Sequence, residues 1–333
     1  MNNNGKIRQF IASRDLGQLL VITAGLVLMI IVFSFLNPNF MTWRNIENLL
    51  RAISPILLIG MGQGFVLITG NIDLSIGSVI GMSTMTSATL MTMGVNPWVA
   101  MMITLCAGLS FGFTNGILVA KVGLPPFIAT LGTMTIARGW AQMVNGSFNT
   151  DSIGDHARGF SQFFYYGRTL GVFTLVWIAL ALFLIFNFLL SRTRLGRHIY
   201  ATGSNKEAAK LSGVAVDWVI VKAYLISSFL ATTVGLTLTA QARMGSMDAG
   251  TMHELFAVAA AVIGGISTFG GKGRLVGVIV GASIWVVLQN GLQFAGAPLG
   301  IRNIVIGAII IVSVSLDVVV RANSNIRKVK KAT

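Results

Sequence analysis

Side chains that could act on a small molecule are sparse in this sequence, and the most conspicuous of them is an acid. Asp73 lies in G-N-I-D-L-S-I-G-S (residues 70–78), at a break between two apolar runs and without a cationic neighbour. An ionised carboxylate at membrane depth costs about 2.5–3.5 kcal/mol on insertion scales, so it should cap a helix, be paired or line water. Two interpretations stay open. Asp73 or Ser75 caps the helix that follows, or Asp73 lines a polar passage, and a broken helix can do both.

Uncharged hydrogen-bonding residues lie inside or beside other apolar runs. Such groups suit a neutral, hydroxylated solute better than an ion, but they also hold helices together. The hypothetical pathway residues are Asp73, Ser75, Asn115, Phe127, Thr130, Thr133, Asn290 and Gln293.

Sequence motifs of enzymes are missing. G-G-K-G (residues 270–273) lacks a Ser or Thr after the lysine and a glycine five residues before Gly271, so it is not a nucleotide-binding P-loop. The three histidines are far apart and show no metal-ligand spacing. Cys106 is alone, which excludes an intramolecular disulfide. We therefore expect no catalytic residue, no metal and no cofactor on this chain.

Composition places the chain in a membrane. Apolar residues make up 54% of the sequence and charged residues 10%, and the mean hydropathy is +0.78, which indicates an integral membrane protein. The net charge of +14 does not indicate nucleic-acid binding, because the charges lie between the apolar runs. The 38 glycines are expected where membrane helices pack backbone to backbone.

The apolar runs predict an all-α protein with about ten membrane spans in a single domain over residues 1–333. The expected spans are 16–36, 53–69, 76–93, 98–120, 127–144, 170–190, 219–240, 255–269, 275–294 and 304–320. The first run is too long for a signal-peptide core, so we expect it to remain uncleaved. Residues 43–51 are amphipathic and are expected to lie in the membrane interface.

Glycine spacing indicates where two parts of the chain pack closely or repeat. On the fourth span Gly108, Gly112 and Gly116 recur every four residues, which lets another helix approach. A constant offset of 200 residues relates two further sets of glycines and hints at an internal duplication, as in many transporters, although small-residue packing alone can give the same pattern. These sets are Gly70, Gly77 and Gly81, and Gly270, Gly277 and Gly281.

One polar stretch, from Arg192 to Asp217, interrupts the apolar runs. In it Ser204 and Glu207 are spaced as a capping box, and Gly213 supplies a left-handed residue that ends a helix. Residues 205–212 are therefore expected to form a helix of about 12 Å. Such a helix is either a loop helix that maintains topology or a docking element for a partner, and its residues alone do not decide between the two.

The distribution of cations predicts the orientation. With both termini on one side of the membrane, 17 of the 24 Lys and Arg residues lie on the side of the 192–217 stretch and seven lie on the other. By the positive-inside rule this stretch, the tail 1–15 and the tail 321–333 are cytoplasmic. A partner of the short helix would then be a cytoplasmic protein.

Five stretches resemble the membrane permeases of bacterial ABC importers of the ribose, xylose, galactose and autoinducer-2 type, and they follow one another through nearly the whole chain. Asn71 departs from the glycine that many members carry. The matching stretches are G-N-I-D-L-S-I-G-S (70–78), N-G-I-L-V-A-K (115–121), P-P-F-I-A-T-L-G-T-M (125–134) with R-G (138–139), L-G-R-H-I-Y-A-T-G-S-N-K-E-A-A-K-L-S-G (195–213) and A-V-I-G-G-I-S-T-F-G-G-K-G-R-L-V-G (261–277).

This resemblance implies a fold like that of the larger ABC importers, with ten helices per subunit and two permease subunits, identical or paralogous, around a pathway in the bacterial inner membrane. It implies that a separate cytoplasmic ATPase uses ATP, that a periplasmic or lipid-anchored binding protein delivers a monosaccharide, and that the chain itself is a transport subunit and no enzyme. Residues 191–218 would be the coupling loop, and its helix would enter the ATPase. The residues of that contact would be Ser204, Asn205, Lys206, Glu207, Ala208, Ala209 and Gly213.

Two other interpretations of the function stay open. A branched-chain amino acid ABC permease belongs to the same superfamily. An ion-coupled secondary transporter would need intramembrane ionisable relays, for which Asp73 alone is thin support.

Overall fold

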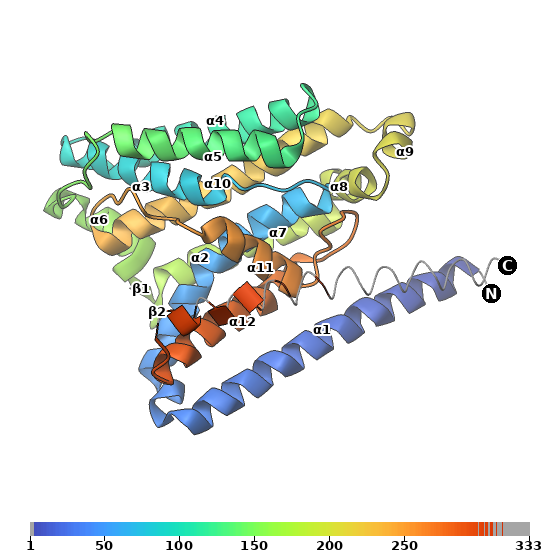
Figure 1. Cartoon of the computed structure of the whole chain (residues 1–333), viewed down its shortest axis with the longest axis horizontal. Helices are drawn as coiled ribbons and strands as arrows, with labels where there is room; N and C mark the ends of the chain where they lie inside the picture. The colour runs from blue at the N-terminus through green and yellow to red at the C-terminus, as the bar shows by residue number, and fades with distance from the viewer. Residues whose placement is uncertain are drawn as a thin grey trace.

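The computed structural model describes residues 3–298 and, beyond these, residues 300–302, 304, 305, 307, 308, 311 and 315. Almost all of the regular structure is helical (Figure 1). The helices are α1 (Asn3–Leu36), α2 (Trp43–Ile68), α3 (Ile76–Thr92), α4 (Pro97–Ala120), α5 (Pro126–Met143), α6 (Arg158–Ser161), α7 (Thr174–Arg192), α8 (Arg194–Ser204), α9 (Lys206–Leu211), α10 (Val216–Ala242), α11 (His253–Ile263) and α12 (Leu275–Phe294).

Short elements join some of these helices. A 3-10 turn, Pro38–Met41, follows α1. Between α5 and α7 lie a second 3-10 turn (Asp155–Ala157), α6, a π-helical turn (Gln162–Tyr166) and a two-residue antiparallel hairpin of β1 (Arg168–Thr169) and β2 (Val172–Phe173), in which Arg168 is opposite Phe173.

The long helices follow the predicted spans. In the described part of the chain α1, α2, α4, α7, α10 and α12 are long and apolar enough to cross a membrane. The shorter α3 and α5 coincide with the third and fifth predicted spans. The eighth predicted span, 255–269, is wrong beyond residue 263, because α11 ends there and non-helical backbone follows. The prediction of an all-α membrane protein is confirmed. The predicted tenth span, 304–320, lies mostly outside the described residues.

Residues 43–51 do not form a helix of their own, and their location in the membrane interface stays a prediction. They are the first part of α2, which continues through Pro55. Asn45 is buried, and its side-chain amide pairs with that of Asn290 on α12 over distances of 3.0 and 3.2 Å. Asn45 thus joins the start of α2 to α12, while the apolar side chains of Trp43 and Leu50 remain exposed.

α10 lies in the centre of the fold and packs against α2, α3 and α4. Its contact with α4 follows the predicted glycine stripe. A Cβ atom at Gly108 would overlap the hydroxyl of Thr232, and one at Gly116 would lie 2.6 Å from the Cα of Val221. The prediction that the stripe admits another helix is confirmed, and that helix is α10.

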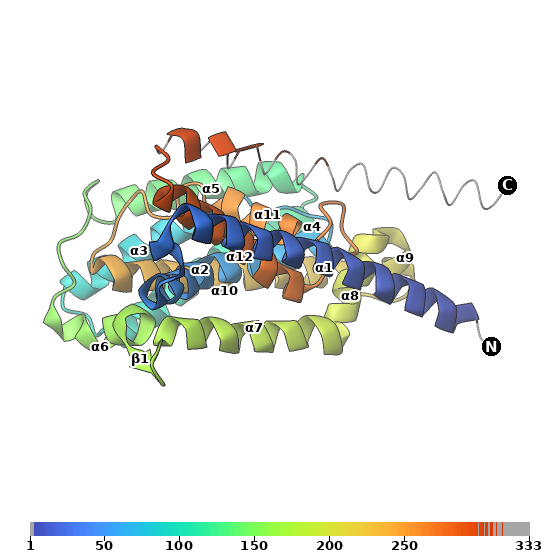
Figure 2. The same cartoon turned by 90° about the horizontal axis from the view of Figure 1, so that it is seen from below.

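α1 lies along the edge of the molecule and packs against α12 (Figures 1 and 2). The ring of Phe33 lies directly against Gly291, where any larger residue would collide with it. Asn37 Nδ2 donates to the carbonyl of Phe294 at 3.0 Å. Only 6% of the Leu19–Leu36 segment is buried within the protein. Most of the surface of this segment is therefore available to lipid.

Two non-helical segments enter the fold beside each other. Residues 69–75 connect α2 to α3, and residues 264–274 connect α11 to α12. Gly70 and Gly270 are both left-handed, with φ of +81° and +85°, and a Cβ atom at Gly270 would lie 2.9 Å from the Cα of Gly70. Two glycines that the 200-residue offset pairs thus share a conformation and meet in space, while the duplication itself stays a prediction.

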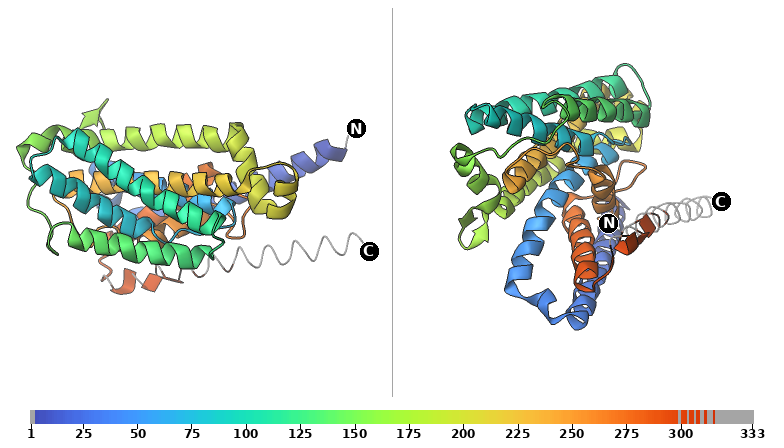
Figure 3. Two further views of the ribbon diagram at one scale, coloured as in Figure 1. Left: turned by 90° about the horizontal axis from the view of Figure 1, so that it is seen from above. Right: turned by 60° about the vertical axis from the view of Figure 1, so that its left-hand side comes forward.

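The connections segregate to the two ends of the molecule. α8 and α9, the loop between α4 and α5 and the segment 264–274 lie at the same end as the start of α1 (Figures 1 and 3). The segment 144–173 and the connection between α10 and α11 lie at the opposite end. This is the segregation on which the predicted orientation depends.

Candidate functional site

Asp73 is held in the non-helical segment before α3 and is almost completely buried. Its Oδ1 accepts hydrogen bonds from the amide and the hydroxyl of Ser75, at 3.0 and 2.6 Å. Its Oδ2 accepts from the hydroxyl of Ser227 on α10 at 2.7 Å. Non-helical backbone is tolerated at membrane depth only where protein or a cavity satisfies it. Asp73 thus fixes this segment to both α3 and α10.

The hydrogen bonds continue from Ser75 to α4 and α5. Asn115 Nδ2 donates to the hydroxyl of Ser75 at 2.9 Å, and the hydroxyl of Thr133 donates to Asn115 Oδ1 at 2.6 Å. All of these side chains are buried. We call Asp73, Ser75, Asn115, Thr133 and Ser227 the buried network. Four of its members were predicted pathway residues, and in this conformation they bond to one another and line no open passage.

The other predicted pathway residues lie elsewhere. The hydroxyl of Thr130 donates to the carbonyl of Pro126 in its own helix. Phe127 and Gln293 are exposed, and Asn290 pairs with Asn45 as described above. The structure therefore gives these four residues no common site, and their part in transport stays a prediction.

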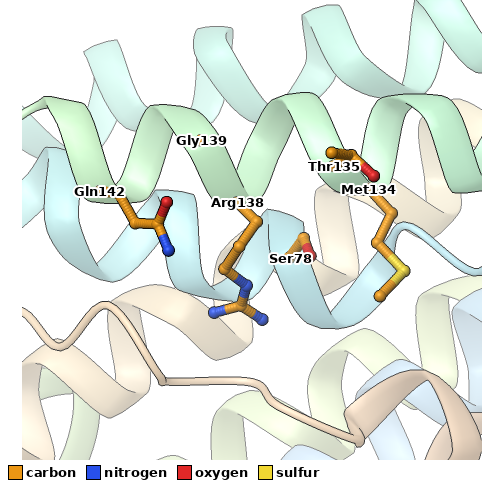
Figure 4. Close-up of a pocket in the computed structure, with 6 residues that line it drawn as sticks. All are labelled: Ser78, Met134, Thr135, Arg138, Gly139 and Gln142. Atoms are coloured by element: carbon orange, nitrogen blue, oxygen red, sulfur yellow. The ribbon is translucent and has the colours of Figure 1, made fainter.

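A cavity of about 270 Å³ lies between α3 and α5. Figure 4 shows Arg138 and Gln142 reaching from α5 toward α3, with Ser78 of α3 near the guanidinium group. The cavity is lined by Ser78, Met134, Thr135, Arg138, Gly139 and Gln142.

Two charged side chains approach α3 at two of its glycines, one turn apart. A Cβ atom at Gly77 would overlap the carboxylate of Glu254, and one at Gly81 would lie 2.7 Å from Nη1 of Arg138. The same Nη1 donates to the carbonyls of Met247 and Ala249 in the connection before α11. α3 thus has room for both charged side chains because it carries glycine at these two positions.

Arg138, Ser78 and Glu254 were not among the residues predicted to form a site. Arg138 offered a signal, since it interrupts the fifth apolar run and ionisable residues within membrane helices are commonly functional. Glu254 and Ser78 offered no such signal. Glu254 comes near Arg138 only because α11 packs on α3, and Ser78 comes near it only because α5 packs on α3.

The stretch 192–217 contains two helices where the sequence predicted one. α8 ends at Ser204, so the predicted capping box of Ser204 and Glu207 is wrong. Asn205 caps α9 instead, and its Oδ1 accepts from the amide of Ala208 at 2.9 Å. Gly213, with φ of +81°, follows the helix as predicted.

The surface of α9 differs from the expected one at two positions. Ala209 is only 5% exposed and belongs to the hydrophobic core. It was expected to contact a partner, but its side chain is not on the surface. Ala208, Lys206 and Glu207 are exposed. Leu211, which was not among the predicted contact residues, is 90% exposed. Leu211 is thus the large apolar side chain that α9 leaves uncovered.

α8 connects α9 to the end of α2 and to the segment 264–274. A Cβ atom at Gly203 would overlap the carbonyl oxygen of Ile68 and would lie 2.6 Å from the amide of Gly271. That amide donates to the Ile68 carbonyl at 2.8 Å, and the hydroxyl of Tyr200 donates to the carbonyl of Gly273 at 2.7 Å. We call this contact of α8, the end of α2 and the segment 264–274 the α8 junction.

No group of three or more His, Cys, Asp or Glu residues that could hold a metal ion occurs among the described residues.

Comparison with protein families gives one match, which covers most of the chain. Residues 45–314 match the family described as the branched-chain amino acid transport system / permease component.

Several curated proteins are similar to this chain over nearly its full length. The ribose import permease protein RbsC of Escherichia coli (strain K12) is 38% identical over 293 residues, which cover 88% of this chain and 91% of that protein. The D-allose transport system permease protein AlsC of the same organism is 38% identical, with 88% and 89% covered. Its galactose/methyl galactoside import permease protein MglC is 32% identical, with 88% and 91% covered. No solved structure matches this chain.

Proposed function

This chain belongs to the branched-chain amino acid transport system / permease component family, and from this premise we propose that it is the transmembrane subunit of an ATP-driven (ABC) sugar importer. The observation that carries the proposal is the similarity to sugar permeases, at up to 38% identity over 88% of the chain. The cargo is a monosaccharide, and the chain is a transport subunit and no enzyme. Branched-chain amino acid transport is not favoured, although the family is named for it.

The remaining parts of the transporter follow as proposals. ATP is hydrolysed on a separate cytoplasmic ATPase, a binding protein delivers the sugar outside, and a second permease subunit completes the pathway. The protein lies in the bacterial inner membrane with α8 and α9 in the cytoplasm. Segregation of cations supports this orientation, because among the described residues most of the lysines and arginines belong to the segments at the end with α8 and α9.

The assembled transporter is expected to import a sugar. Proteoliposomes that contain the permease with its ATPase and binding protein should accumulate labelled D-ribose, D-allose or D-galactose when ATP is supplied on the ATPase side. Labelled L-leucine serves as the comparison. ATP-dependent uptake of leucine without uptake of any of the three sugars would overturn the sugar assignment.

We propose that α9 is the contact with the ATPase, through Ala208 and Leu211. Ala208→Trp should leave α9 itself intact, since helix propensities differ by well under about 1 kcal/mol, but should clash with a closely fitting partner, as overpacking costs about 1–3 kcal/mol. Leu211→Ser should remove an apolar contact. Both variants should insert normally and lose co-purification with the ATPase together with sugar uptake.

Two controls separate docking from folding. Ser110→Trp adds similar bulk at an exposed position on α4, outside the 191–218 loop, and should change neither readout. Ala209→Trp should lower the yield of folded permease, because Ala209 is buried. If Ala208→Trp and Leu211→Ser both bind the ATPase normally, α9 is not the coupling helix.

A further inference from the structure

We infer that the cavity between α3 and α5 is a binding site for the sugar during its passage, with hydrogen bonds from Ser78, Gln142 and Arg138 to the sugar hydroxyls. The inference rests on the proposed function and assigns a place in the permease to its cargo. None of these residues belongs to the buried network, and none was among the predicted pathway residues.

Ser78 supplies the first observation. The Ser78 hydroxyl is fully buried and has no hydrogen-bond partner in the described part of the protein. Ser78 is also one of the residues that line the cavity. A buried polar group without a partner costs about 1–3 kcal/mol, so it is rare unless a ligand or water completes it. A hydroxyl group of a sugar in the cavity can both donate to and accept from Ser78.

Arg138 and Gln142 supply further donors on the facing helix. Within the described residues Arg138 hydrogen-bonds through Nη1 alone, to Met247 and Ala249, so Nε and Nη2 remain for a ligand. The amide of Gln142 is exposed and has no hydrogen bond to the described residues. A guanidinium and an amide present adjacent donors in a plane, which matches neighbouring hydroxyls on a sugar ring.

The charges around the cavity favour a neutral ligand. Glu254 approaches α3 one helical turn from Arg138 and has the opposite charge. Both residues are described by the structure, and no ion pair within 4.0 Å joins them. The two charges offset each other in the local potential, whereas an anion or a cation would meet a like charge within one turn. A polar, uncharged solute is therefore the best match, and a volume of about 270 Å³ suits a single sugar ring.

The location of the cavity also indicates a pathway. Gly132, Thr135, Gly139 and Gln142 lie at helical spacing along α5, and all four are exposed. A Cβ atom at either glycine would meet nothing within 4 Å. Amide and hydroxyl side chains are unfavourable against lipid tails, but Ile128, Ile136 and Met143 are exposed on the same side of α5. This mixed face fits a contact with the second permease subunit that encloses a partly polar space.

The test compares two pairs of variants in proteoliposomes that contain the whole transporter. Ser78→Ala and Gln142→Ala remove groups that hold nothing in the described part of the protein, so yield and ATPase binding should not change. Each should slow uptake of the transported sugar at least tenfold. Gly139→Leu should block uptake by filling the cavity, whereas Gly25→Leu, at an open glycine on α1 with nothing within 4 Å, should leave most of it.

A second readout distinguishes contact with the sugar from a general defect. Monodeoxy analogues of the transported sugar each lack one hydroxyl. The analogue without the hydroxyl that contacts Ser78 should be transported at the same rate by the wild type and by Ser78→Ala. The same binding protein delivers the analogue to both permeases, so any effect of the missing hydroxyl on the binding protein is equal in the two.

The outcomes separate this inference from the proposed function. If the wild type imports a sugar but Ser78→Ala and Gln142→Ala retain full rates for every analogue, the cavity is not the site while the importer assignment stands. Equal block by Gly139→Leu and Gly25→Leu would also overturn a local site. If the wild type imports none of the sugars, the proposed function itself fails.

Discussion

Gly203→Ala is expected to abolish ATP-driven uptake in a permease that still inserts into the membrane. The added methyl group would overlap the carbonyl oxygen of Ile68 and would crowd the amide of Gly271, 2.6 Å away. Both neighbours are backbone, so neither can rotate aside. Overpacking costs about 1–3 kcal/mol in ordinary cores, and here it would also separate the two groups that share a 2.8 Å hydrogen bond.

The effect on transport follows from the position of the α8 junction. α9 is continuous with α8, and α8 contacts the end of α2, from which residues 69–75 run into the buried network. α3 begins there and carries Ser78 into the cavity within its first turn. A movement of α9 on the ATPase would thus reach the cavity through a continuous series of packed elements. A displaced α8 breaks that series at its tightest point.

The measurement is sugar uptake alongside ATPase co-purification, both scaled to the amount of inserted permease. Uptake should fall more than tenfold while the ATPase still binds, because Ala208 and Leu211 are untouched. Gly25→Ala is the matched control: it also adds a methyl group inside a helix, but nothing lies within 4 Å of that position. Normal uptake by Gly203→Ala would show that the α8 junction does not transmit the coupling motion.

The membrane spans could be predicted from the sequence because their signal is local. A run of apolar residues determines that a segment is helical and where it lies, and α12 matches its predicted range of 275–294. The glycine stripe on α4 also predicted a close helix contact, since three small residues on one face leave a flat surface that a neighbouring helix can approach. Identifying α10 as the contacting helix required the structure.

The cap of α9 could not be predicted because it depends on the preceding helix. Ser204 and Glu207 have the spacing of a capping box, but α8 continues through Ser204 and leaves Asn205 as the first residue outside the helix. α8 itself was missed because two glycines, Gly196 and Gly203, suggest a loop. In the structure both are positions of close backbone approach.

The candidate site could be predicted only in part, for a similar reason. Asp73, Asn115 and Thr133 are polar residues in apolar surroundings, and the structure joins them because such groups must find partners within the protein. The cavity depends instead on which helix faces are left uncovered. That depends on packing among α3, α5 and α11, and no spacing within one helix encodes it.

Asp73→Leu is expected to remove most of the folded permease, whereas Asp73→Asn should be tolerated. Leucine fills a similar volume but accepts no hydrogen bond, so the amide and hydroxyl of Ser75 and the hydroxyl of Ser227 would all lose their acceptor. Each orphaned buried donor costs about 1–3 kcal/mol. Three such losses are a large part of a typical net stability of about 5–15 kcal/mol.

Asparagine preserves the geometry without the charge. Its Oδ1 can keep both bonds from Ser75, and its Nδ2 can donate to Ser227 once that hydroxyl rotates to accept. The yield of monodisperse protein in detergent and its unfolding temperature should therefore fall steeply for Asp73→Leu and only slightly for Asp73→Asn. Thr130→Val is the matched control, since it removes a buried hydroxyl that bonds only within its own helix.

Sugar uptake by Asp73→Asn decides what the carboxylate does. If Asp73 serves to join the segment 69–75 to α3 and α10, the asparagine variant should retain most of the transport rate per inserted permease. If Asp73→Leu unfolded at the same temperature as the wild type, Asp73 would not be needed to hold the segment 69–75 to α3 and α10. Loss of uptake by Asp73→Asn at normal protein levels would show that the negative charge itself is needed, and the buried network would then have to open to the pathway during transport.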